Sequence, residues 1–135
     1  MENKLTDQNE WCFACGRLNP CGLKLVFEEQ DDTYFTHFTG TAHHQGYDGI
    51  LHGGIISTLL DEVMARQVYA KGFTAVTARL EVRYLKPTPI GVPLLIKGLI
   101  TRNKGQLYET TGTIELPDGT VTAEGTAKVF VTDPS

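Results

Sequence analysis

The segment from Gly53 to Lys71 most constrains the fold, because it has a helical pattern and is apolar over most of its surface. Gly72 follows it directly and favours the end of a helix at this point. Such a helix cannot face water on all sides, so a sheet must cover it. Its apolar positions include Ile55, Ile56, Leu59, Leu60, Val63 and Met64.

Strand-like segments flank this helix, two before it and four after it. This β-β-α-β-β-β-β order, with long antiparallel strands around one central helix, predicts an α+β chain with the hot dog fold. Residues 1–135 are expected to form a single domain, with about residues 1–20 as an N-terminal extension. The expected strands cover residues 23–30, 33–40, 75–87, 92–102, 107–116 and 121–132.

Alternation in two of these strands predicts which side chains share a face. The strand over 75–87 is expected to place Val76, Ala78, Leu80, Val82 and Tyr84 in the core-facing row, and Thr77, Arg79, Glu81 and Arg83 in the opposite row. The strand over 121–132 is expected to place Val121, Ala123, Gly125, Ala127, Val129 and Val131 on one face. The small residues in the middle of that strand indicate that something bulky lies against the sheet.

An unpaired sheet edge predicts self-association, because pairing across a two-fold axis removes the free edge. We expect a homodimer that assembles further into a homotetramer. The net charge of −4 gives no broad field that favours nucleic acid. No apolar run approaches the roughly 20 residues of a membrane helix, and the polar start lacks the apolar core of a signal peptide. A cytoplasmic protein is therefore expected.

The cysteines Cys12, Cys15 and Cys21 do not indicate a disulfide framework, because their number is odd and no secretion signal precedes them. Cys12 and Cys15 have the spacing of half a zinc site, but no second pair follows them. His43 and His44 lie a strand pair away. Local packing of an N-terminal turn is therefore expected, without a metal.

Two adjacent carboxylates, Asp61 and Glu62, lie on the apolar helix, where an ionised acid needs a partner or a role. Glu62 has Arg66 four residues on, so we expect it to be ion-paired or surface-facing. Asp61 has no cation at helical contact distance within its own helix. A polar stripe of small residues runs from it back to the helix start, and comprises Gly54, Ser57 and Thr58.

The helix start adds free backbone N–H groups with partial positive charge, which can stabilise an oxyanion forming on a carbonyl. Asp61 lies seven residues beyond Gly54, about 10 Å along the axis at 1.5 Å per residue. A second copy with an antiparallel helix would place its own helix start beside Asp61. In the alternative interpretation, the His-Gly-Gly triplet is only a tight helix entry and Asp61 is a satisfied buried acid.

The stretches "AHHQGYDGILHGGIISTLLDE" and "TARLEVRYLKPTPIG" resemble the PaaI-like hot dog thioesterases, relatives of 4-hydroxybenzoyl-CoA thioesterase. The N-terminal "CFACGRLNPCGLKL" is similar to a segment of one bacterial branch of that group. The resemblance extends from about Cys12 to Val131. It implies hydrolysis of acyl-CoA thioesters, with an acyl-CoA partner and no cofactor.

The resemblance also implies roles for individual residues. The acid of the family falls on Asp61, as general base or nucleophile, and the backbone donor to the thioester carbonyl falls on Gly53. A hydroxyl that positions water in some members falls on Thr77. The Asn of some members is replaced here by Gly46. Gln45 is expected to take over the role of this Asn, and His44 is a weaker candidate for it. His52 is expected to fix the loop. Together with Thr77 and Gly54, these residues are the expected substrate-binding residues.

Two other functions and one further surface remain open at this point. Relatives on this fold hydrate acyl thioesters with a catalytic His and an acid, a pairing for which His52 and Asp61 are candidates. A non-catalytic acyl-CoA binding module is the other alternative. The CoA phosphates are expected near Arg79, Arg83 and Lys86, which otherwise belong to solvated strand faces. His37 and His43 are expected to be surface residues.

Overall fold

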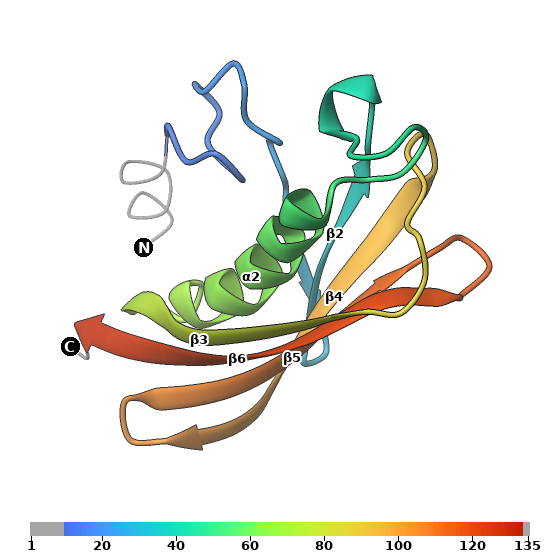
Figure 1. The fold of residues 1–135 in the computed structure, drawn as a ribbon. Coiled ribbons are helices and arrows are strands. Elements are labelled where there is room, and N and C mark those ends of the chain that lie inside the picture. The colour runs from blue at the N-terminus through green and yellow to red at the C-terminus, as the bar shows by residue number, and fades with distance from the viewer. Residues whose placement is uncertain (1–9, 134–135) are drawn as a thin grey trace.

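The computed structural model describes residues 10–133, and α2 (Gly53–Tyr69) lies across the concave face of one curved antiparallel sheet (Figure 1). The sheet order is β1-β2-β4-β5-β6-β3. A single long helix wrapped by a sheet is the hot dog architecture that the sequence predicts. The remaining elements are β1 (Glu28–Gln30), β2 (Thr33–Thr39), the short 3-10 helix η1 (Ala42–His44), β3 (Thr74–Tyr84), β4 (Pro93–Lys104), β5 (Leu107–Glu115) and β6 (Val121–Asp133).

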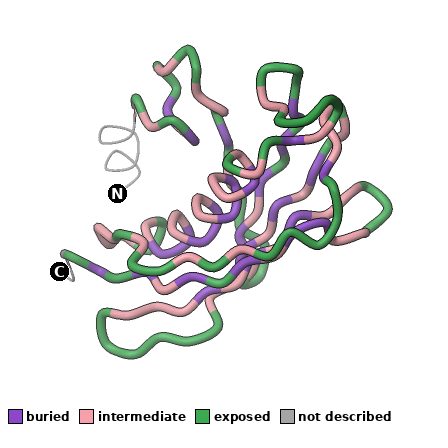
Figure 2. Tube along the Cα trace, viewed as in Figure 1, coloured by how far each residue is buried: buried purple, intermediate pink, exposed green. Residues whose placement is uncertain are grey.

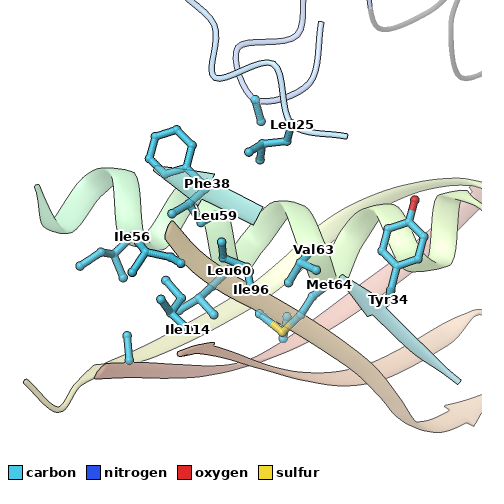
Figure 3. Close-up of a cluster of buried hydrophobic side chains, with 14 of the residues drawn as sticks. Leu25, Tyr34, Phe38, Ile56, Leu59, Leu60, Val63, Met64, Ile96 and Ile114 are labelled. Atoms are coloured by element: carbon cyan, nitrogen blue, oxygen red, sulfur yellow. The ribbon is translucent and has the colours of Figure 1, made fainter. Parts of the chain in front are cut away.

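The core lies between α2 and the sheet. The side chains of Leu60 and Met64 are fully buried and point from α2 toward the strands (Figure 3). A Cβ atom on Gly112 of β5 would lie 3.3 Å from Leu60 Cδ2, and one on Gly125 of β6 would lie 3.5 Å from Met64 Cε. The glycines therefore leave room for the helix, which confirms the bulky neighbour expected from the small residues of 121–132.

The strand expected over 23–30 is wrong for most of its length, because β1 begins only at Glu28. The backbone N–H groups of Leu23 and Leu25 donate to Phe13 O and Ala14 O, at 2.8 and 2.9 Å. Lys24 between them has a φ of 56°, which a strand does not allow. Residues 23–25 therefore pair with the N-terminal segment instead of extending the sheet.

The face assignment within β3 is wrong at its N-terminal end, because a β-bulge interrupts the alternation. Thr77 pairs with Val129 and Arg79 with Lys128, so Ala78 is the extra residue. Thr77 therefore faces α2, whereas Val76 is 52% exposed. Beyond the bulge the prediction holds, since Leu80 and Val82 pack against the core and Arg79, Glu81 and Arg83 are exposed.

One edge of the sheet is β3, which pairs only with β6 in the described chain. Exposed positions run along this edge and the β4–β5 hairpin, while buried positions line the contact of α2 with the sheet (Figure 2). No helix among residues 10–133 is long and apolar enough to cross a membrane. Residues 1–9 of the expected N-terminal extension lie outside the described part of the chain.

Candidate active site

The start of α2 presents a backbone N–H group that has no acceptor within the described part of the chain. His52 is the N-cap, and its Nδ1 accepts a hydrogen bond of 2.8 Å from the N–H of Gly54. Among residues 10–133, no acceptor is present for the N–H of Gly53, the first residue of the helix. That N–H carries the positive end of the helix dipole and is available to a ligand.

The loop before α2 is held by its own polar side chains. Gln45 Oε1 accepts from the N–H of Gly49 at 2.9 Å. His44 Nδ1 accepts from the N–H of Thr41 at 3.0 Å, and the carbonyl of His44 accepts from the N–H of His52 at 2.9 Å. Gln45 and His44, which were expected to bind substrate, therefore form hydrogen bonds within the loop of the single chain. The Nδ1 atom of His52 is likewise used by a hydrogen bond within the chain.

A cavity of about 670 Å³ is lined in part by Gly53. Tyr84 from the end of β3 forms part of its wall, and its Oη donates to Gly53 O at 3.1 Å. Ser57 Oγ lies 2.7 Å from the same Oη. The cavity is lined by Gly46, Tyr47, Ile50, Leu51, His52, Gly53, Ile56, Tyr84, Leu85, Lys86, Pro87 and Thr88.

Asp61 and Thr77 meet on the side of α2 that faces β3. The Oγ1 of Thr77 donates to Asp61 Oδ1 at 2.6 Å, and both residues are half-buried. This contact exists because the bulge at Ala78 turns Thr77 toward the helix. It fixes the orientation of the carboxylate and leaves Oδ2 for a second partner.

Two groups of predicted site residues are separated within one chain. Gly53, Gly54 and His52 lie at the helix start, whereas Asp61 and Thr77 lie about 12 Å further along the axis, at 1.5 Å per residue. Ser57 lies between them, bonded to Tyr84 of the same strand as Thr77. A single chain therefore does not bring the free N–H and the carboxylate onto one small substrate group.

The predicted environment of Glu62 is wrong. Within residues 10–133, its carboxylate forms no ion pair with Arg66, and the residue is half-buried; Cys12 Sγ lies 3.9 Å from its Oε2. Burial raises the pKa of Glu62, and nearby thiols and Arg66 oppose that rise. The guanidinium of Arg66 instead contacts Cys15 Sγ at 2.7 Å.

The basic residues expected near CoA fall into two places. Arg79 lies 3.8 Å from Glu81, and Arg83 lies 3.3 Å from Glu124, both on the exposed face of the sheet. Lys86 lines the cavity beside Gly53. Exposed His37 and His43 lie outside this lining. Of the three expected cations, Lys86 is therefore the one beside the helix start.

Tyr84 is the residue at this site that the sequence did not single out. The signal was present, since the alternation placed Tyr84 in the core-facing row and the proline-containing segment "LKPTP" follows it. Its hydroxyl bonds two residues of the first helical turns, Gly53 and Ser57. The pattern identified its face, but the length of α2 and the curvature of β3 decide which helical turn it reaches.

Comparison with known proteins identifies relatives that are named as thioesterases. The mouse (Mus musculus) protein named acyl-coenzyme A thioesterase THEM4 is 31% identical over 98 residues, which cover 72% of this chain and 42% of that protein. This chain thus spans under half of the length of that curated relative. A solved thioesterase superfamily protein is 32% identical with a TM-score of 0.80, covering 87% of this chain and 61% of that one.

A further solved structure is a Streptococcus mutans protein bound to acetyl CoA. It is 25% identical with a TM-score of 0.75, and the match covers 81% of this chain and 89% of that one. The family model described as thioesterase superfamily matches residues 48–123, which span α2, β3, β4, β5 and the first three residues of β6. The resemblance to hot dog thioesterases is confirmed, and the chain belongs to the thioesterase superfamily.

Proposed function

We propose that this chain hydrolyses acyl-CoA thioesters to a free acid and CoA. The observation that carries the proposal is that Gly53, whose N–H has no acceptor among residues 10–133, lines a cavity of about 670 Å³ at the start of α2. A cavity of that size is large enough for an acyl group with part of the CoA arm. The acyl-CoA substrate is also consistent with the name of the mouse relative and with the acetyl CoA bound by the Streptococcus mutans protein.

In the proposed reaction, the Gly53 N–H donates to the thioester carbonyl oxygen. That oxygen gains negative charge when the carbonyl carbon is attacked, and the helix dipole adds to the stabilisation. Asp61 either removes a proton from the attacking water or attacks the carbonyl carbon itself. In the first route the carbon–sulfur bond breaks, the sulfur takes up the proton and CoA leaves as its thiol, while water supplies the hydroxyl of the acid. In the second route CoA leaves as its thiolate and the acyl group stays on Asp61 as an anhydride. Water then hydrolyses the anhydride, which releases the acid, restores the carboxylate and supplies the proton of the CoA thiol.

The proposed site is shared between two chains. Ser57 and Asp61 both bond to β3, the strand whose outer edge is unpaired in the described chain. If two copies pair through this edge, their α2 helices run antiparallel and each helix start approaches the other copy's Asp61. This arrangement removes the separation of about 12 Å between Gly53 and Asp61 within one chain.

Lys86 is proposed to lie near the anionic part of the ligand. Its side chain is exposed at the mouth of the cavity that contains Gly53. Tyr84 is proposed to hold the first turn of α2, because its hydroxyl forms hydrogen bonds with both Gly53 O and Ser57.

The function is tested by incubating the protein with a panel of saturated acyl-CoAs and with one enoyl-CoA, and by measuring the release of the CoA thiol. We expect thiol release from at least one saturated acyl-CoA; hydration of the enoyl-CoA without thiol release would contradict the proposal.

Removing the hydroxyl of Thr77 is expected to slow hydrolysis. In Thr77→Val, Asp61 loses the 2.6 Å hydrogen bond that orients its carboxylate, and kcat should fall about tenfold or more, with KM little changed. Thr77→Ser retains the hydroxyl and should keep kcat within about threefold of the wild-type value. Steady-state kinetics of the two variants check this, and equal kcat values for Val and Ser would show that the hydrogen bond has no role.

A further inference from the structure

A cluster of two thiols and one carboxylate lies on the side of α2 away from the sheet. The N-terminal segment passes over that side of the helix (Figure 1). Cys12 and Cys15 come from a tight turn of this segment, and Glu62 comes from α2. One oxygen or sulfur atom of each residue lies within 4.8 Å of those of the other two.

The turn that presents the thiols is well fixed. The N–H of Gly16 donates to Cys12 O at 2.8 Å, and a Cβ atom on Gly16 would lie 2.4 Å from Cys12 N. The pairing of residues 23–25 with Phe13 and Ala14 holds the segment from the other side. The two thiols are therefore presented to α2 by a backbone that leaves little freedom.

The charge of Glu62 is compensated only in part by the nearby Arg66. Among residues 10–133, its carboxylate makes hydrogen-bond contacts with the Cys12 and Cys15 thiols, which are weak donors. Cys12, Cys15 and Glu62 are all half-buried. A half-buried carboxylate held by two thiols is poorly solvated unless a cation lies between them.

We propose that Cys12, Cys15 and Glu62 bind a divalent transition-metal ion of the zinc class, with water in the fourth position. Thiolate sulfur selects such ions over Mg²⁺ and Ca²⁺, and a carboxylate oxygen is an accepted third ligand. Zn–S bonds of about 2.3 Å in a tetrahedral site place two sulfurs about 3.8 Å apart, so the cluster needs to contract only slightly. The ion holds the N-terminal segment to α2.

Arg66 completes the charge balance of the proposed site. Two thiolates and one carboxylate around a divalent ion leave one net negative charge, and the Arg66 guanidinium contacts Cys15 Sγ at 2.7 Å. The rings of Phe27 and Tyr69 lie 5.4 and 5.9 Å from its Cζ and fix its position. A donor to a metal-bound thiolate is a common outer-sphere interaction.

A disulfide between Cys12 and Cys15 fits this environment less well. Oxidation would remove both thiol hydrogens from the neighbourhood of Glu62, and its half-buried carboxylate would then have no donor in the cluster. The sequence favoured simple packing because it showed only two ligands near each other. Glu62, 50 residues away from Cys12 along the chain, is the third ligand that the fold adds.

Cobalt(II) titration of the untagged full chain tests the site. The protein is stripped with EDTA, kept reduced with a phosphine reductant and titrated with Co²⁺. We expect saturation at one equivalent, a thiolate-to-cobalt charge-transfer band with the visible bands of a tetrahedral site, displacement by Zn²⁺, and release of about two protons per ion. Absence of stoichiometric binding, or binding without the charge-transfer band, would overturn the proposal.

Variants assign the ligands. The double variant Cys12→Ser/Cys15→Ser should lose the charge-transfer band, and Glu62→Gln should weaken Co²⁺ binding at least about tenfold while keeping the band. Cys21→Ser is the matched control, because Cys21 is exposed and lies outside the cluster, and its binding should equal that of the wild type. Circular dichroism checks each fold. If the double variant unfolds, the Co²⁺ spectrum of the wild type and the Co²⁺ affinity of Glu62→Gln still test the proposed site. Unchanged affinity in Glu62→Gln, or lost binding in Cys21→Ser, would contradict the assignment.

Discussion

Asp61→Asn is expected to lower acyl-CoA hydrolysis by at least about a hundredfold, within the range for loss of a general base. The amide has nearly the same shape and can still accept the hydrogen bond from Thr77, so the fold and the local geometry should persist. It can neither take a proton from water nor attack the thioester. Thiol release at saturating acyl-CoA measures the loss, and circular dichroism and size exclusion confirm that the fold and the assembly are unchanged.

Asp32→Asn is the control for this variant. It removes the same charge from an exposed turn before β2, away from both halves of the proposed site. Its turnover should stay within about twofold of the wild-type rate, as for most surface substitutions. A similar loss in both variants, or full activity in Asp61→Asn, would show that Asp61 does not carry the reaction.

Gly53→Pro is expected to lower kcat by about a hundredfold to a thousandfold, the range for loss of one oxyanion donor. Proline removes the N–H and is well tolerated at the first position of a helix, where that N–H has no intrahelical acceptor. The preceding His52 has a ψ of 137°, which a following proline allows. Thermal unfolding should therefore change little, and steady-state kinetics should show the loss in kcat.

Gly53→Ala is the matched control, because alanine retains the N–H. Its Cβ would lie 3.6 Å from the Tyr84 ring, an ordinary contact, and the φ of Gly53 lies outside the left-handed region. We expect its kcat to remain within a few-fold of the wild-type value. If alanine were as damaging as proline, the effect would come from bulk beside Tyr84 and not from the missing donor.

Much of the fold is readable from the sequence because it depends on local patterns. The small residues of β6 predict a bulky neighbour, and the structure places Met64 of α2 beside Gly125. Gly72 after the helix has a φ of 101°, a conformation for which glycine is the usual choice. These features depend on periodicity and on single backbone positions, both of which a sequence displays directly.

The features that the sequence did not reveal depend on contacts between distant segments. The bulge at Ala78 moves Thr77 to the helix face, and strict alternation cannot indicate an inserted residue. Arg66 lies four residues after Glu62 on the same helix and was expected to pair with it. Instead, Cys12 of the N-terminal turn contacts Glu62, and Arg66 contacts Cys15. Tyr84 likewise contacts Gly53 only because β3 curves along α2.

Mixing the two inactive variants tests the shared site most directly. Asp61→Asn and Gly53→Pro proteins are unfolded together, refolded and assayed for thiol release. If each site combines Gly53 of one chain with Asp61 of the other, half of the dimers are hybrids with one intact site, and about a quarter of the wild-type turnover returns. Activity that stays at the average of the two parent variants would contradict a site shared between chains.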